Sequence, residues 1–221
     1  MRKKVLFIGN SITKHSPSEE NGWLGNWGMA ATSEENDYVH RLTERINKKY
    51  SNVEFKWENI FKFEKYFYDF SKFDTSKFLP LAEFGADIIV ATFGANIRNV
   101  TNEQDAELET DEIFTPQRYS DLINFFNPNR KAAVIAAVTT LTPEENAEVI
   151  KEAAKRSGYT LVDISDLTQR KYTAADYREC GSVFTPNVIA PVLNHPGDLG
   201  MEEIANRLFP VLCGKIDEIL L

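Results

Sequence analysis

The sequence has few of the residues from which metal centres and disulfide frameworks are built. Among 221 residues there are only two cysteines and three histidines. The cysteines, Cys180 and Cys213, are too few for a disulfide framework and form no metal-ligand pattern. We therefore expect two buried thiols and no metal site.

Positive charge and long apolar runs are scarce as well. The chain has 25 Lys and Arg against 33 Asp and Glu, a net charge of −8, which argues against nucleic acid and anionic membrane surfaces as partners. No apolar run reaches membrane-spanning length. Residues 1–4 are basic, as in a signal peptide, but the apolar stretch after them is too short for one. We expect a cytoplasmic protein from the chain as given, or a secreted or periplasmic one if a signal peptide was trimmed.

Short apolar, β-rich segments alternate along the chain with segments of helical periodicity. This alternation predicts a parallel sheet between two layers of helices, a three-layer α/β/α sandwich. Right-handed crossovers favour the flavodoxin-like strand order 2-1-3-4-5. With no internal repeat or composition break, residues 1–221 are expected to form one domain. The expected strands are 4–8, 53–58, 86–93, 132–138 and 160–164, and the expected helices are 37–50, 116–126, 143–156 and 199–219.

Ser11 is the first candidate for chemistry. It follows the apolar run 5–8 and Gly9, where a strand ends and a turn begins. The carboxyl end of such a strand is where α/β sheets bind ligands. An isolated Gly-Asn-Ser is also an ordinary turn. The motif therefore indicates a catalytic serine only if other suitable residues lie at the same edge of the sheet.

Two further residues meet that condition. Asn96 follows the third expected strand, whose carboxyl end would lie beside that of the first in this strand order, and its amide N–H could stabilise a developing oxyanion. His195 precedes the last expected helix and could act as a base toward Ser11. Together they predict nucleophilic acyl transfer.

These motifs resemble those of the SGNH hydrolases, also called the GDSL esterase/lipase family. Segment 9–13, Gly-Asn-Ser-Ile-Thr, is similar to the family's Ser block, with Asn10 where aspartate is usual. Segment 94–96, Gly-Ala-Asn, is similar to the Asn block, and His195 with Pro196 to the His block. The resemblance implies Ser11 as nucleophile and His195 as base, with the Ser11 N–H and the Asn96 side chain in the oxyanion hole.

The chain departs from the family after its second strand. The family's Gly block supplies a backbone N–H to the oxyanion hole, and the matching position here is Glu64. The N–H of Glu64 could still serve, but a carboxylate nearby would oppose negative charge.

The second departure concerns the acid that orients the histidine. The family's acid lies three residues before the histidine, a position held here by Val192. A main-chain carbonyl near Val192, the carboxylate of Glu64, or Asp198 could orient His195 instead. We favour the carbonyl, which implies a dyad slower than a triad and a His195 pKa near the ordinary value of about 6.5.

The segment after Ser11 is long, and loops of such length are often functional. Trp23, Trp27 and Met29 within it could wall a pocket for an acyl chain or stack on a sugar ring, or they could simply pack onto the domain. Asn10 and Gly94, within the matched blocks, are also expected at the substrate.

The sequence thus predicts a serine esterase that hydrolyses small esters without metal or organic cofactor. The resemblance implies an acetyl group on a carbohydrate as substrate. The alternative is a non-catalytic ligand- or carbohydrate-binding protein on the same fold, whose triad has lapsed at Val192. A nucleotide or flavin binder is disfavoured, because the first strand is followed by neither a Gly-x-Gly-x-x-Gly pattern nor a phosphate loop with lysine.

Overall fold

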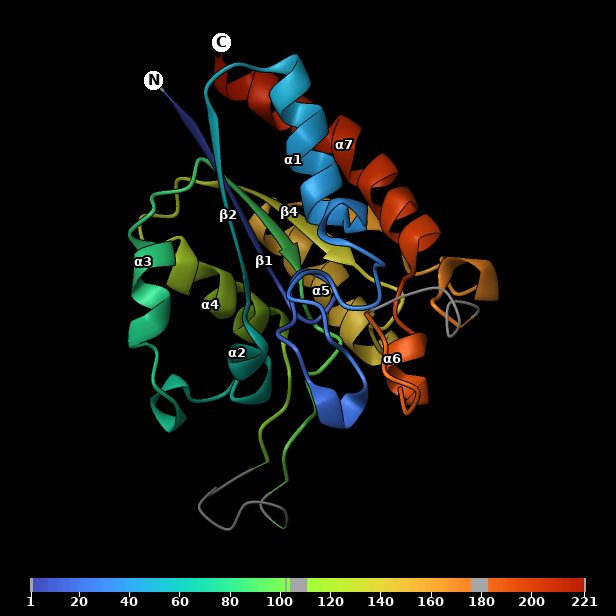
Figure 1. The fold of residues 1–221 in the computed structure, drawn as a ribbon. Helices are drawn as coiled ribbons and strands as arrows, with labels where there is room; N and C mark the ends of the chain where they lie inside the picture. The colour runs from blue at the N-terminus through green and yellow to red at the C-terminus, as the bar shows by residue number, and fades with distance from the viewer. Residues whose placement is uncertain (1, 102, 104–110, 176–182, 221) are drawn as a thin grey trace.

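Five parallel strands form a sheet through the middle of the protein in this computed structural model (Figure 1). The structure describes residues 2–101, 103, 111–175 and 183–220; Cys180 lies outside them. The strand order is β2-β1-β3-β4-β5, as the sequence predicts, and every neighbouring pair is parallel. The strands are β1 (Lys3–Gly9), β2 (Val53–Asn59), β3 (Ile88–Thr92), β4 (Ala133–Val138) and β5 (Thr160–Asp163).

The four long helices begin and end within one or two residues of the expected bounds. Asp37 caps the first of them by accepting a hydrogen bond from the His40 N–H. Gly158 ends α5 with a φ of 70°, a conformation that glycine adopts without strain. The three short helices were not predicted, because four or five residues are too few to show a helical period. The helices are α1 (Tyr38–Lys49), α2 (Phe61–Lys65), α3 (Leu79–Ala82), α4 (Pro116–Phe126), α5 (Glu144–Ser157), α6 (Ala190–Leu193) and α7 (Asp198–Leu220).

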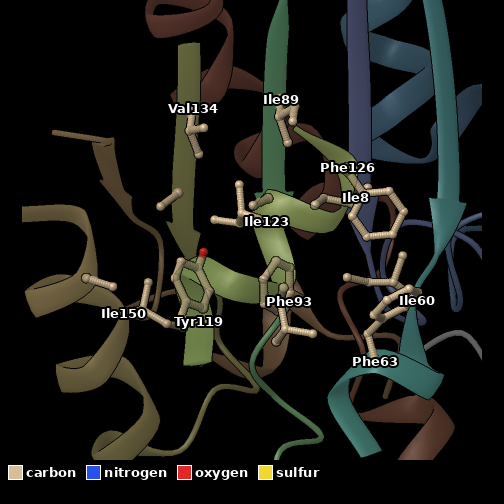
Figure 2. Packing of buried hydrophobic residues seen from close by; sticks show 14 of the residues in the cluster. Ile8, Ile60, Phe63, Ile89, Phe93, Tyr119, Ile123, Phe126, Val134 and Ile150 are labelled. Carbon is tan, nitrogen blue, oxygen red and sulfur yellow. The ribbon is translucent and has the colours of Figure 1, made fainter. Parts of the chain in front are cut away.

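Each face of the sheet has its own apolar core, because successive strand residues point to opposite faces. On one face, residues such as Ile8 and Ile89 pack against α4 and α5, and the Phe93 ring stacks on Tyr119 with centroids 4.7 Å apart (Figure 2). On the other face, Phe7 and its neighbours pack against α1 and α7, which lie side by side (Figure 1). Cys213 is buried in this second core, as expected for a structural thiol.

A third, smaller apolar cluster joins the segment after β1 to the chain around α6. Trp23 is fully buried in it, 5.8 Å from the ring of Phe184, and Val192 of α6 belongs to the same cluster. The Leu24 N–H donates to the Val183 carbonyl across the same contact. This cluster therefore ties the turn after β1 to the segment that carries His195.

Candidate active site

Ser11 lies in the turn that follows β1, and buried hydroxyl groups fix that turn. Gly9 is the last residue of β1, and no side chain fits there, because a Cβ would lie 1.9 Å from the Thr13 hydroxyl oxygen and 2.3 Å from that of Thr92. The two threonine hydroxyls are 2.8 Å apart and both are bonded to the Tyr38 hydroxyl. The absent side chain thus lets the turn close tightly over the end of β3.

His195 follows α6 and contacts Ser11 directly. Its Nε2 lies 2.8 Å from the Ser11 Oγ, and its Nδ1 lies 2.8 Å from the main-chain oxygen of Pro191. A carbonyl can only accept, so Nδ1 carries the proton and Nε2 is left to accept from the serine hydroxyl. The expectation of a carbonyl near Val192 agrees with this contact, although the Val192 oxygen itself accepts from the His195 N–H.

Burial lowers the pKa of His195 below its ordinary value, because the charged imidazolium is poorly solvated in this pocket. The Pro191 carbonyl opposes the shift, and the nearby His15 adds to it. The expectation of a pKa near the ordinary value left burial out of account, and it is corrected to a lowered pKa. A neutral imidazole, the form that can accept a proton, is favoured.

Neither of the two candidate acids reaches His195. Asp198 begins α7 and accepts hydrogen bonds from Thr32 and Asn36. Glu64 is fully buried and accepts from Asn10 and from the turn at 94–96. Both proposals for a carboxylate beside Nδ1 are therefore corrected: each acid is held by other donors, and Nδ1 is bonded to a carbonyl.

Glu64 is instead the centre of a buried polar network. Its Oε1 accepts from the Asn10 amide at 3.2 Å, the Gly94 N–H at 2.7 Å and the Asn96 N–H at 3.2 Å. Its Oε2 accepts from the Asn96 side-chain amide at 2.7 Å. Burial raises the pKa of Glu64, and these four donors oppose the rise by favouring the ionised form.

The oxyanion donors differ in part from expectation. The Glu64 N–H is not available, because it donates to the Ile60 carbonyl at 3.3 Å within the turn that opens α2. The N–H of Ser11 has no acceptor among the described residues. The Asn96 amide uses one of its two hydrogens on Glu64, which leaves the other. Ser11 and Asn96 thus remain as candidate donors.

A pocket of about 300 Å³ opens at Ser11. Met29, expected from the long segment, lines it. So do Asn59, the last residue of β2, and Phe61, the first residue of α2, both of which sequence reasoning missed. Asn10, Trp23, Trp27 and Gly94 do not line it. The residues that line it are Ser11, His15, Asn21, Met29, Asn59, Phe61, Asn96, Ile189, Pro191, Val192 and His195.

Other contacts hold the four expected residues that do not line the pocket. Asn10 and Gly94 are turned toward Glu64. Trp23 is buried in the third cluster, and the Trp27 indole N–H donates to the Ala31 carbonyl at 2.9 Å. Their expected role at the substrate is therefore corrected to a structural one.

Across the described ranges, no three His, Cys, Asp or Glu side chains gather as metal ligands would. No helix in these ranges has the length and apolarity needed to cross a membrane.

Comparison with known proteins gives similarity at the level of structure. No family model matches the sequence, and no curated protein matches it significantly. The esterase EstA from Pseudoalteromonas sp. has 10% identity and a TM-score of 0.53, over 97% of this chain and 99% of its own. A protein described as a GDSL-like lipase from Bacteroides uniformis has 13% identity and a TM-score of 0.53, over 96% of both chains. Another so described, from Bacteroides ovatus, has 12% identity and a TM-score of 0.51, over 97% and 99%. The chain has the α/β fold of the SGNH hydrolases.

Proposed function

We propose that this protein is a serine esterase in which Ser11 and His195 act as a dyad. The observation that carries the proposal is the chain of contacts from the Pro191 carbonyl through the imidazole to the Ser11 Oγ, each 2.8 Å long. A serine hydroxyl bonded to an oriented, neutral imidazole is the arrangement that nucleophilic catalysis requires. The shared fold with an esterase and GDSL-like lipases supports the same reading.

In the proposed reaction, Ser11 Oγ attacks the ester carbonyl while its proton passes to His195 Nε2. The carbonyl oxygen becomes negative and is stabilised by the Ser11 N–H and the free hydrogen of the Asn96 amide. The C–O bond to the alcohol then breaks, and the alcohol takes the proton from Nε2. Water attacks the acyl-serine by the same steps and releases the acid.

His195 Nδ1 is bonded to a carbonyl, with no carboxylate from the described residues beside it, and this changes the energetics of the reaction. The Pro191 carbonyl keeps Nδ1 protonated and fixes the ring, but a carbonyl dipole stabilises the imidazolium less than a carboxylate does. We therefore expect a slower enzyme than one with a full triad. The pocket volume suits a small acyl group, and an acetyl ester on a carbohydrate is the substrate we propose.

The test is hydrolysis of 4-nitrophenyl acetate by the native protein and by Ser11→Ala. We expect turnover by the native protein and a loss of at least about 1000-fold in the variant, with the melting temperature nearly unchanged because Ser11 is only half-buried. Native protein that shows no turnover on any short-chain ester would favour the non-catalytic binding protein instead.

A further inference from the structure

A second cleft, lined largely by polar and basic side chains, adjoins the Ser11 pocket. It has a volume of about 350 Å³, enough for a sugar ring. His15, Asn59 and Phe61 line both spaces. The alcohol part of an ester held at Ser11 could therefore extend into this cleft.

The charge of the cleft is opposite to that of the whole molecule. Three lysines line it, Lys14, Lys62 and Lys77, against a single acid, Glu58, although the chain has a net charge of −8. Lys14 and Glu58 neutralise each other as an ion pair of 2.9 Å. The net positive charge of the cleft therefore comes from the other two lysines.

Lys62 and Lys77 have no carboxylate within ion-pair distance among the described residues. Lys62 lies 5.9 Å from the ring centroid of Tyr66, and Lys77 lies 4.7 Å from that of Phe78. Asp74, which is bonded to Ser76, is near enough to Lys77 for the ammonium to lower its pKa slightly, but the pair is not in contact. Both side chains are exposed, so their ammonium groups are available to an anion.

The other groups in the cleft suit a sugar. Ser16, Asn26 and Asn59 offer hydroxyl and amide groups, and Phe61, which is exposed, offers aromatic surface. Sugar hydroxyls can bond to the first set, and the C–H face of a pyranose can lie on the Phe61 ring.

We propose that this cleft binds the carboxylate of an acidic saccharide, so that the substrate is an ester of a uronic acid sugar. The inference rests on the proposed esterase function and adds to it the class of alcohol. Lys62 and Lys77 act as specificity-determining residues that lower KM without taking part in the chemistry.

The kinetic test compares O-acetylated glucuronic acid with O-acetylated glucose, which has a neutral CH₂OH in place of the carboxylate. We expect the glucuronic acid ester to have the higher kcat/KM, and Lys62→Met and Lys77→Met each to lower this advantage about three- to fivefold through KM. The effect should shrink as salt is raised, because both lysines are exposed. Lys65→Met is the matched control, since Lys65 is on the same helix and does not line the cleft.

A binding measurement separates this proposal from the esterase function. Glucuronate and glucose are titrated into the Ser11→Ala variant, and glucuronate should bind more tightly unless Lys62 and Lys77 are replaced. Equal binding of the two sugars would overturn the cleft proposal even if 4-nitrophenyl acetate is hydrolysed. Preferential glucuronate binding without any ester turnover would uphold the cleft and refute the esterase.

Discussion

Replacing Glu64 with glutamine tests whether a buried carboxyl group holds the Asn96 amide in place for catalysis. In the native protein all four neighbours of this carboxyl group are donors. Glutamine retains one acceptor oxygen, which fits the Oε1 position with its three donors. Its NH₂ group would then face the Asn96 amide, donor against donor, and the Asn96 side chain would have to turn away.

The size of the effect follows from these contacts. Losing one oxyanion donor costs about 100- to 1000-fold in rate, and a displaced Asn96 should lose part of that, so we expect kcat to fall about 10- to 100-fold with little change in KM. The lost hydrogen bond to a charged group should cost about 1.5–3 kcal/mol of stability. Glu64→Ala would leave several buried donors unsatisfied, so it is the less informative variant.

The assay is a double-mutant cycle with Asn96→Ala, read in kcat for 4-nitrophenyl acetate. If Glu64 acts through Asn96, Glu64→Gln should have little further effect on kcat once Asn96 is alanine. Asn127→Ala is the control for lost stability alone, because its buried side chain accepts from Lys131 and Ala132 outside the Ser11 pocket. It should lower the melting temperature and leave kcat unchanged.

Two results would refute this reasoning. Equal loss of kcat from Glu64→Gln in the native and the Asn96→Ala backgrounds would show that Glu64 acts independently of Asn96. Native kcat in Glu64→Gln, at temperatures where the variant is folded, would show that the Asn96 amide needs no such support.

Asn96→Ala should lower kcat about 100- to 1000-fold with a smaller change in KM, and a change confined to KM would make Asn96 a ground-state binding residue. The pH profile of kcat/KM should fall on the acid side with a midpoint below about 6.5, because burial lowers the pKa of His195 and only its neutral form accepts the Ser11 proton; a midpoint above that value would indicate a paired carboxylate. Val192→Asp should lower the melting temperature by about 10 °C without raising kcat, since Val192 is buried at 3% exposure and Nδ1 is already bonded to Pro191; a faster enzyme would show that an acid can enter there.

The strand order and the pairing of Ser11 with His195 could be predicted because each depends on signals strong in the sequence. Buried parallel strands appear as apolar runs such as 88–92, and the topology then brings their carboxyl ends together. The orientation of His195 by a main-chain carbonyl could also be predicted, because Val192 occupies the position where the family has its acid.

Other features depend on how side chains pack at long range, which no local pattern reports. Glu64 accepts a hydrogen bond from the Gly94 N–H, which lies 30 residues away in the sequence. Nothing in the sequence around Glu64 indicates that its side chain is buried beside Asn96. The sequence around Trp23 is equally compatible with a pocket wall and with packing onto the domain. Its contact with Phe184, a residue far away in the sequence, decides for packing. The lowered pKa of His195 likewise comes from burial that only the folded chain creates.

The central claim, that Ser11 is a nucleophile activated by His195, is tested most directly by covalent labelling. The native protein is treated with a fluorophosphonate, and the modified peptide is located by mass spectrometry. We expect one adduct on the Ser11 Oγ, absent from Ser11→Ala and formed much more slowly in His195→Ala. An unlabelled native protein, or an adduct on another residue that persists in Ser11→Ala, would contradict it.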